Sequence, residues 1–475
     1  MTPTVSLDDL VSATEIEVRG NVPDAAQMPL ARNSRAVQTG DLFVAIHGER
    51  FDGHDFVGEA AANGAAAALV SRSWAATVEG EAPLPLVLVD DPVAALQKAA
   101  AARRAKLKLT VVGITGSVGK TSTKEVIAAI LEQRFATYRS PGNMNSEVGL
   151  PWSLLEVEPG TEIAVLEMGG AYAFGELALL ADIAKPKIGV VTNIYPVHLE
   201  RMGTIEAIAE TKSELVAALP DDGVAILNGD DPRVRAMAGR ARGRVLTYGL
   251  NRENDIRGER VETEGLEGTN FWLRLAGDRL HIKVPLVGSH AVQLALAGIA
   301  AGHAMGMHIS EMLPGFDDPR IQVRLLMLPG PNGSRMIDDT YNASTPSVLS
   351  ALALLHELRP KRRIAVLGDM RELGSLTDEE HRIVGRRAAE VADVLITYGE
   401  MARIIADEAA TTATVDGRQL AVTSFGLDQR GQLVDFLRQQ LRKGDTVLLK
   451  GSRGLQMEEF VEALREDASG RESDA

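Results

Sequence analysis

The chain has 475 residues, a formal net charge of −15 at pH 7 and no cysteine. Its length predicts about three domains. The acidic balance argues against a nucleic-acid surface, because binding a phosphate backbone needs concentrated lysine and arginine. Without cysteine there are no disulfides and no thiolate nucleophiles or ligands. The N-terminus lacks a signal-peptide pattern, and the apolar run 60–70 is too short and alanine-rich to span a bilayer. We therefore expect a cytoplasmic enzyme that does not contact membranes.

Residues 1–107 predict a small α/β domain. Between its first strand and its first helix lies the polar loop 47–55, which contains two histidines, His47 and His54, and two aspartates, Asp52 and Asp55. This loop could hold a metal ion or contact a ligand. We favour ligand contact, because the loop has no helical i, i+4 pair of metal-binding side chains. The predicted elements of this domain are strands 41–46 and 85–89 and helices 56–67 and 93–106.

The central domain, 108–313, begins with a phosphate-binding pattern. An apolar, β-branched run at 109–114 predicts a buried parallel strand, and helical spacing begins near Lys120. Between them lies a glycine-rich bend that ends in Gly119-Lys120-Thr121. Small residues let backbone N–H groups converge on an anion, the lysine adds a charge, and the threonine hydroxyl can hold Mg²⁺. Ile114 stands where the standard loop has its first glycine. An ordinary βα turn is the alternative, but Lys-Thr at a helix start favours a nucleoside-triphosphate site.

Two further central strands lead to candidate metal ligands. The strand 163–166 is followed by Glu167, and the strand 188–192 is followed after a short loop by His198. The carboxyl ends of parallel strands meet at one edge of a sheet, so both side chains are expected near Thr121 as Mg²⁺ ligands. The helix 205–219 carries several charged residues, and by itself its pattern indicates a solvated face. A strand at 224–227 and an antiparallel hairpin at 271–284 on the sheet edge complete the domain.

The last domain, 314–475, alternates strands and helices and predicts a doubly wound sheet. Three of its strands lead into polar or glycine-bearing turns at 338–342, 368–374 and 450–454, where functional loops of such sheets lie. The predicted fold is thus α/β with three domains: a small α/β N-terminal domain, a central P-loop-type, mostly parallel ATPase domain and a C-terminal Rossmann-like domain. The predicted strands of the last domain are 335–337, 364–367, 394–397, 420–423 and 446–449.

Four stretches resemble the Mur ligases, the ATP-dependent amide-forming enzymes of peptidoglycan precursor synthesis. They are Gly40-Asp-Leu-Phe-Val-Ala with 47–54, the loop 115–121, the stretch 338–343, and 367–374 with His381 followed by 450–453. The second stretch is shared by all members and accounts for the displaced glycine. The last two are similar to those of members that add D-alanyl-D-alanine to UDP-N-acetylmuramoyl-tripeptide.

The resemblance implies roles for individual residues. Lys120, Lys212, Glu167 and His198 would form the catalytic set, with Thr121, Glu167, His198 and Lys212 at two Mg²⁺ ions. Lys212 matches a lysine that the family carbamylates. The implied nucleotide contacts are Thr115, Gly116, Ser117, Gly119, Lys120, Thr121 and Ser122, with Arg324 and Asp339 from the last domain. The implied substrate contacts are Ser34 and Arg35 for the uridine diphosphate, Asn143 and Asn145 for the UDP-MurNAc-peptide, and Tyr341 and Asn342 for the dipeptide.

The implied reaction activates the tripeptide carboxylate as an acyl phosphate, which D-Ala-D-Ala then attacks. Residues 1–107 would bind the UDP substrate, 108–313 would bind ATP, and 314–475 would close over the nucleotide and bring the dipeptide, in a monomer. Two alternatives stay open. One is a sibling ligase that adds a single amino acid, or a folate-type polyglutamate ligase, against which the stretches 338–343 and 367–374 argue. The other is a nucleotide-gated binding protein without catalysis, against which the intact catalytic set argues.

Overall fold

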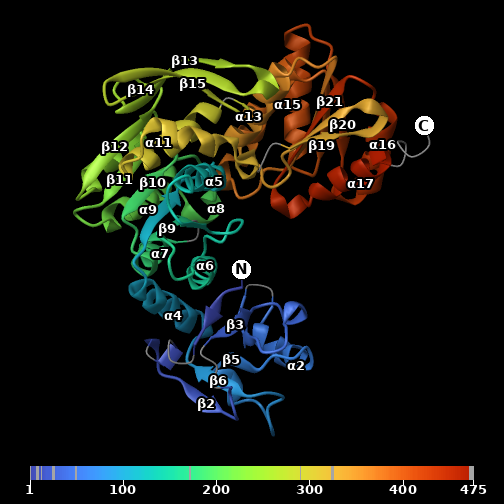
Figure 1. Cartoon of the computed structure of the whole chain (residues 1–475). Coiled ribbons are helices and arrows are strands. Elements are labelled where there is room, and N and C mark those ends of the chain that lie inside the picture. The colour runs from blue at the N-terminus through green and yellow to red at the C-terminus, as the bar shows by residue number, and fades with distance from the viewer. Residues whose placement is uncertain are drawn as a thin grey trace.

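The structure is a computed structural model of the whole chain. It describes residues 2–6, 10–11, 13–23, 27–48, 51–170, 173–288, 290–322 and 326–469. Within these residues, three mixed sheets follow one another along the chain, each covered by helices (Figure 1). The predicted three-part α/β fold is confirmed.

The N-terminal sheet has the strand order β1-β3-β4-β5-β6-β2, in which β3 to β6 are parallel and β1 and β2 are antiparallel edges. The predicted helix 56–67 is wrong in its second half. The helix ends at Ala62, and Ala67 begins a fully buried strand between β4 and β6. Alanine is compatible with both helix and strand, so the burial of this segment between two strands determines that it forms a strand. The elements are β1 (Thr4–Val5), β2 (Glu17–Arg19), β3 (Met28–Ala31), β4 (Leu42–Val44), α2 (Val57–Ala62), β5 (Ala67–Ser71), α3 (Arg72–Ala75) and β6 (Leu86–Val89).

Helix α4 (Pro92–Lys106) joins the first sheet to the second. Asp91 caps its start by accepting hydrogen bonds from the backbone N–H groups of Val93 and Ala94, and Pro92 fits its first turn. Its buried residues Leu96 and Ala99 share one hydrophobic core with the N-terminal sheet and with helices of the central domain. In Figure 1 the helix lies between the two bodies. It therefore couples them by packing as well as by covalent connection.

The central sheet places the phosphate-loop strand β7 between β10 and β9, in the order β15-β14-β13-β12-β11-β10-β7-β9-β8. Every neighbouring pair from β8 through β7 to β13 in this order is parallel. The pairs β13–β14 and β14–β15 are antiparallel. The predicted edge hairpin is confirmed, with Leu275 opposite Asp278 at its turn. Val112 and Ile114 of β7 pack in the core that contains α5 and α11, while Val111 packs in the core that contains α4, α6 and α7.

Both faces of β7 are therefore covered, which explains its continuous apolar sequence. The central elements are β7 (Thr110–Thr115), α5 (Lys120–Leu131), β8 (Thr137–Arg139), α6 (Gly149–Leu155), β9 (Ile163–Glu167), α7 (Glu176–Ala184), β10 (Ile188–Val191), α8 (Leu199–Met202), α9 (Ile205–Ala218), β11 (Val224–Asn228), α10 (Pro232–Ala236), β12 (Arg244–Gly249), β13 (Ile256–Thr263), β14 (Thr269–Leu275), β15 (Asp278–Val284), α11 (Ala291–Ala304) and α12 (Ile309–Met312).

The C-terminal sheet has the order β16-β17-β21-β18-β19-β20 and is parallel except for β16. Helices α13, α14 and α15 cover one face and α16 and α17 the other, as a doubly wound sheet requires. The elements are β16 (Leu326–Pro329), β17 (Arg335–Asp338), α13 (Thr345–Glu357), β18 (Arg362–Gly368), α14 (Thr377–Val391), β19 (Val394–Tyr398), α15 (Ala402–Val415), β20 (Ala421–Phe425), α16 (Arg430–Gln440), β21 (Asp445–Lys450) and α17 (Glu458–Ser469).

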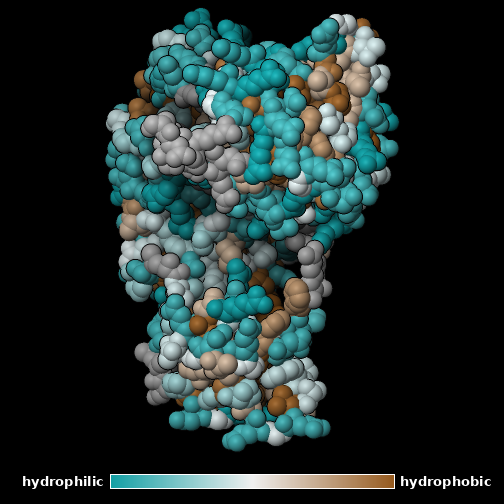
Figure 2. Space-filling model, turned by 90° about the vertical axis from the view of Figure 1, so that its right-hand side faces the viewer, coloured by the Kyte–Doolittle hydropathy of each residue, from teal (hydrophilic) through white to brown (hydrophobic). Residues whose placement is uncertain are grey.

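The expected domain boundaries after residues 107 and 313 stay predictions; the first lies between β6 and β7 and the second between β15 and β16. The face of the molecule shown in Figure 2 is mostly hydrophilic, with small scattered apolar patches. In the described part of the chain, no helix has the length and apolar character needed to cross a membrane.

Candidate active site

The glycine-rich bend between β7 and α5 is held open by the residues that follow β10. Gly116 has φ +138° and Gly119 has φ +84°, conformations that favour glycine. The Asn193 side chain accepts a hydrogen bond from the N–H of Val118 (2.8 Å) and donates one to its carbonyl (2.9 Å). Ser117 donates from its hydroxyl to the carbonyl of Tyr195 (3.0 Å). The two neighbouring strand ends thus fix the backbone of the predicted phosphate loop.

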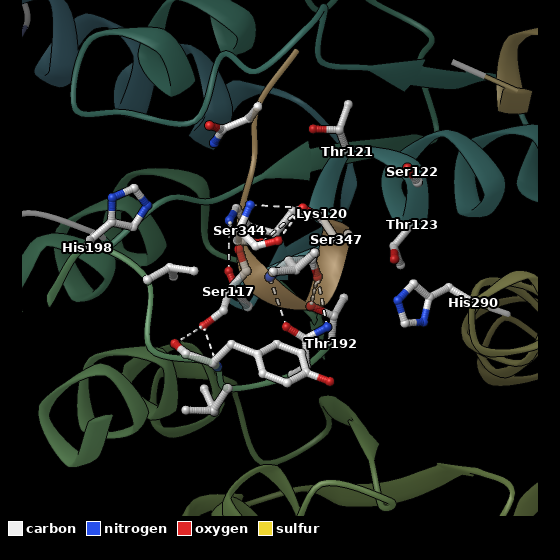
Figure 3. Close-up of a pocket in the computed structure, with 18 of the residues that line it drawn as sticks. Ser117, Lys120, Thr121, Ser122, Thr123, Thr192, His198, His290, Ser344 and Ser347 are labelled. Atoms are coloured by element: carbon white, nitrogen blue, oxygen red, sulfur yellow. Dashed lines mark hydrogen bonds between the residues drawn. The ribbon is translucent and has the colours of Figure 1, made fainter. Parts of the chain in front are cut away.

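Lys120, the first residue of α5, lies over this loop. Its ammonium group donates to the carbonyl oxygens of Gly116 (2.8 Å) and Ser117 (3.2 Å). Figure 3 shows Lys120 beside Ser117, with Thr121, Ser122 and Thr123 following on the same helix. The first N–H groups of α5 point toward the loop, and Lys120 adds a positive charge there. This arrangement can bind a chain of phosphate groups.

Thr121, Glu167 and Asn145 meet next to the loop, as strand adjacency predicts for the first two. The Thr121 hydroxyl donates to one Glu167 oxygen (2.7 Å), and the Asn145 amide donates to the other (2.6 Å). Glu167 is buried. A hydroxyl, a carboxylate and an amide are oxygen donors of the kind that Mg²⁺ binds, and Mg²⁺ commonly takes one or two carboxylates and completes its shell with phosphates and water. This donor set fits the ion.

Lys212 lies beside this group and is buried. From α9 its ammonium donates to the carbonyl oxygens of Gly169 (2.6 Å) and Gly170 (2.7 Å), just beyond β9. Burial lowers the pKa of Lys212 well below its ordinary value, and the nearby positive charge of Lys120 lowers it further. The interpretation of α9 as a solvated charged face is wrong at this position, since only 3% of Lys212 is exposed. An amine of lowered pKa can react as a nucleophile.

His198 lies at the same sheet edge but has a partner from the C-terminal domain. It has φ +57°, and its Nδ1 is hydrogen-bonded to Glu372 in the loop after β18. The bond to His198 lowers the pKa of Glu372 against the opposing effect of its burial. His198 is therefore a bridge between two domains in this structure, and its role as a metal ligand stays a prediction.

The C-terminal domain contributes its own charged group. Lys450, the last residue of β21, is buried and donates to the Asp339 carboxylate (2.6 Å) and to the carbonyl of Asn342 (2.9 Å). The guanidinium group of Arg453 lies 5.2 Å from the ring centre of Tyr341. The turns after β17 and β21 are thus tied to each other, as their parallel pairing allows.

All of these groups surround one cavity of about 1280 Å³ between the central and C-terminal sheets. Figure 3 shows Ser347 of α13, with Ser344 and His290 just before the starts of α13 and α11, around the same space as the phosphate loop. Of the residues predicted from the sequence, those that line the cavity are Gly116, Ser117, Gly119, Lys120, Thr121, Ser122, Asn143, Asn145, Glu167, His198, Lys212, Asp339, Tyr341 and Asn342.

The remaining predicted residues lie elsewhere. Thr115 is buried below the loop and donates to the carbonyl of Gly169 (3.2 Å). Ser34 and Arg35 lie in the N-terminal domain, where both contact Glu59. Arg324 lies outside the described residues.

The polar loop 47–55 has a structural explanation. The buried His54 accepts a hydrogen bond from the N–H of Ser71 (3.0 Å) through Nε2 and contacts Asp52 through Nδ1 (2.6 Å). Among the described residues of this loop, 47–48 and 51–55, and in the rest of the described chain, no three acidic or histidine side chains come together to hold a metal ion. The metal alternative for the loop therefore has no support among the described residues.

Comparison with known protein families decides the class of this fold and site. Family models match residues 30–104 (Mur ligase family, catalytic domain), 114–302 (Mur ligase middle domain) and 323–453 (Mur ligase, glutamate ligase domain). A UDP-N-acetylmuramoyl-tripeptide–D-alanyl-D-alanine ligase of Bacillus subtilis (strain 168) is 36% identical, over 92% of this chain and 93% of that protein. The chain belongs to the Mur ligase family.

Other relatives of this Mur ligase extend over nearly its whole length. The Escherichia coli (strain K12) protein of the same name is 33% identical over 98% of this chain and 99% of its own. A crystal structure of MurF from Acinetobacter baumannii superposes with a TM-score of 0.84 and 28% identity, covering 98% of this chain and 99% of that one. MurF from Thermotoga maritima in complex with ADP gives a TM-score of 0.75 at 31% identity, covering 94% and 98%.

Several residues that shape this Mur ligase site were not identified as functional from the sequence. Asn193 lies two residues after the end of β10, so its position after a buried strand was a usable signal. Lys450 also ends a strand, but the sequence does not show that it reaches Asp339. Glu372 contacts His198 across two domains, and no local pattern indicates such a contact.

Proposed function

We propose that this Mur ligase joins D-alanyl-D-alanine to UDP-N-acetylmuramoyl-tripeptide with hydrolysis of ATP to ADP and phosphate. The observation that carries the proposal is the single cavity in which the phosphate loop, Glu167 and Lys212 face the loops after β17, β18 and β21. The names of the full-length relatives give the same substrates. We propose that the reaction takes place in the cytoplasm, and the expected monomer stays a prediction.

The first chemical step forms an acyl phosphate. An oxygen of the terminal tripeptide carboxylate attacks the γ-phosphorus of ATP, and the bond to the β-phosphate oxygen breaks to release ADP. Negative charge moves to the leaving oxygen, and Lys120 with the N–H groups of the loop is placed to stabilise it. Because these donors are already fixed by Asn193 and Ser117, little reorganisation is needed at the moment of transfer.

The second step forms the amide. The amine of D-Ala-D-Ala attacks the acyl carbon, a tetrahedral intermediate forms, and phosphate leaves with the oxygen that came from the carboxylate. The amine loses a proton in this step. Asp339 and Glu372 are carboxylates of the C-terminal domain at the cavity, and Lys450 holds Asp339 in place while Glu372 is bonded to His198. A domain that carries the acceptor and closes over the acyl phosphate would also exclude water from the intermediate.

Mg²⁺ would be held by Thr121 and Glu167, with His198 as a further ligand after release from Glu372, and it would neutralise phosphate charge. Carbamylation of Lys212 joins its nitrogen to the carbon of CO₂ with loss of a proton and gives a carboxylate-like group. The lowered pKa of the buried amine supports this proposal, since the uncharged amine is the reactive form. Arg324 and Asp339 are proposed as nucleotide contacts, and Ser34, Arg35, Asn143 and Asn145 as contacts to the UDP substrate.

The experiment that tests the mechanism follows an oxygen atom. UDP-N-acetylmuramoyl-tripeptide labelled with ¹⁸O in its terminal carboxylate is incubated with ATP, Mg²⁺ and D-Ala-D-Ala, and the products are measured by mass spectrometry. The acyl-phosphate route predicts a UDP-linked pentapeptide and inorganic phosphate that carries one ¹⁸O. Pentapeptide with unlabelled phosphate would contradict the route, and the absence of pentapeptide would contradict the function.

A further inference from the structure

Two arginine side chains at the C-terminal side of the cavity lack an acidic partner. Three arginines line the cavity, and Arg233 among them is paired with Glu206. Arg371, in the loop after β18, and Arg453, in the turn after β21, are exposed, and neither is paired with a carboxylate in the part of the chain that the structure describes. In a protein of net charge −15, two guanidinium groups at one cavity without a carboxylate partner among the described residues point to an anionic ligand.

The nearby carboxylates are already occupied. Asp339 is bonded to Lys450, and Glu372, which follows Arg371 in the sequence, is bonded to His198. The positive charge of the two guanidinium groups is therefore not neutralised by this side of the cavity. A ligand carboxylate placed between them would form charge-assisted hydrogen bonds, and the flat fork of each guanidinium group suits the two oxygens of a carboxylate.

The two arginines belong to one local structure. Their strands, β18 and β21, are parallel neighbours, with Leu367 opposite Lys450. The N–H of Arg371 donates to the Ser452 hydroxyl (2.9 Å), which ties the two loops together. A Cβ atom on Gly454 would lie only 2.5 Å from Nη1 of Arg371, so this glycine makes room for the guanidinium group beside Arg453. The guanidinium group of Arg453 lies 5.2 Å from the ring centre of Tyr341 and donates to its hydroxyl (3.4 Å).

We infer that Arg371 and Arg453 form a clamp for the terminal carboxylate of the D-alanyl-D-alanine acceptor. The inference rests on the proposed function and assigns the residues that select the acceptor. The phosphate groups of ATP belong at the phosphate loop, and the tripeptide carboxylate is consumed when it becomes an acyl phosphate. The acceptor carboxylate is the anionic group of the substrate that the C-terminal domain is proposed to bring, and it stays charged from binding to product. If the clamp holds the carboxylate end of the dipeptide, the amine at the other end can point toward the acyl phosphate.

The clamp makes a specific kinetic prediction. The acceptor carboxylate does not change during the reaction, so its contacts are equally strong in the ground state and the transition state. Losing them should raise the KM for D-Ala-D-Ala and leave kcat nearly unchanged. Loss of one charge-assisted hydrogen-bonding group typically weakens binding by about ten- to hundredfold.

The test compares the parent with Arg371→Gln and Arg453→Gln, using D-Ala-D-Ala and its C-terminal amide as acceptors in the presence of the full set of substrates. Arg335→Gln is the matched control, because Arg335 is an exposed arginine at the opposite end of β17 and does not line the cavity. The parent and the control should prefer the free acid by about tenfold or more. Each clamp variant should raise the KM for the acid by a similar factor, use the amide as the parent does, and keep the KM values for ATP and the UDP substrate.

Equal use of acid and amide by an active parent would overturn the clamp, as would variants that raise the KM for ATP or the UDP substrate instead. Partial recovery in Arg371→Lys and Arg453→Lys would support it, since lysine keeps the charge without the fork. A parent that forms no product with D-Ala-D-Ala would overturn the proposed function, and the clamp with it. A parent with normal turnover and clamp variants like Arg335→Gln would overturn the clamp alone.

Discussion

Gly116 of the phosphate loop allows a prediction whose size follows from the structure. Its φ of +138° strains any other residue, and a Cβ atom there would lie 2.0 Å from the Thr192 hydroxyl oxygen. It would also lie 3.1 Å from the backbone nitrogens of Thr192 and Asn193. The hydroxyl cannot rotate away freely, because it donates to the carbonyl of Val118 (2.9 Å) and helps hold the loop. Gly116→Ala must therefore move the loop.

The free-energy cost of Gly116→Ala can be compared with that of Gly119→Ala in the same loop. A positive φ costs a non-glycine residue about 1–2 kcal/mol, and losing the Thr192 hydrogen bond costs about 0.5–1.5 kcal/mol. With the backbone contacts, Gly116→Ala should cost about 3 kcal/mol, which corresponds to about a hundredfold loss in ATP affinity if binding requires the original loop. A Cβ atom on Gly119, at φ +84°, meets nothing within 4 Å. Gly119→Ala should thus cost only the conformational free energy of the positive φ, which corresponds to about a tenfold loss in ATP affinity.

The assay is the KM for ATP from initial ADP release, together with the nucleotide Kd from calorimetry, for the parent and the two variants. Circular dichroism and thermal unfolding without nucleotide serve as the folding control. The reasoning predicts that Gly116→Ala weakens ATP binding about ten times more than Gly119→Ala does. Equal effects of the two substitutions, or a stronger effect at Gly119, would refute it.

Three further predictions concern the same edge of the central sheet. Lys120→Ala should lower kcat by about 10² to 10³ at saturating ATP while the fold is kept, because it removes one preorganised contact to developing negative charge. Near-normal turnover would contradict this role for Lys120. Lys187→Ala, on the surface, is the control. Asn193→Ala removes two hydrogen bonds to Val118 and should raise the KM for ATP by about tenfold or more, which a titration of ADP release against ATP checks. Lys212→Ala should be nearly inactive and partly rescued by short-chain carboxylic acids, and an unmodified Lys212 in well-ordered density with both metals bound would count against carbamylation.

The features that could be predicted from the sequence are those set by local burial. The strands around β7 are covered on both faces, so each appears as a continuous apolar run, and the polar residues after them mark one sheet edge. This is why Thr121 and Glu167 could be placed together before the structure was known. The strand β13, with the sequence IRGERVET, was not predicted, because it lies in the antiparallel extension, where one face carries charged residues.

Contacts between domains could not be predicted in this way. His198 and Glu372 are 174 positions apart, and their hydrogen bond depends on how two separately folded sheets are placed. The contact of Lys450 with Asp339 depends on two strands that become neighbours only when the C-terminal sheet is assembled. The roles of Lys212 and Asp339 came from the family resemblance, and the structure adds the burial of the amine and the partner of the carboxylate.

The choice of acceptor tests the central claim most directly. Initial ADP release is measured with UDP-N-acetylmuramoyl-tripeptide and either D-Ala-D-Ala, D-Ala, L-Lys or meso-diaminopimelate. A site built for a dipeptide leaves buried partners unsatisfied when a single amino acid binds, at roughly 1–3 kcal/mol for each group. We predict that D-Ala-D-Ala supports turnover at least about tenfold better than any single amino acid. Equal or faster turnover with a single amino acid would contradict the assignment and leave only the general Mur ligase reaction.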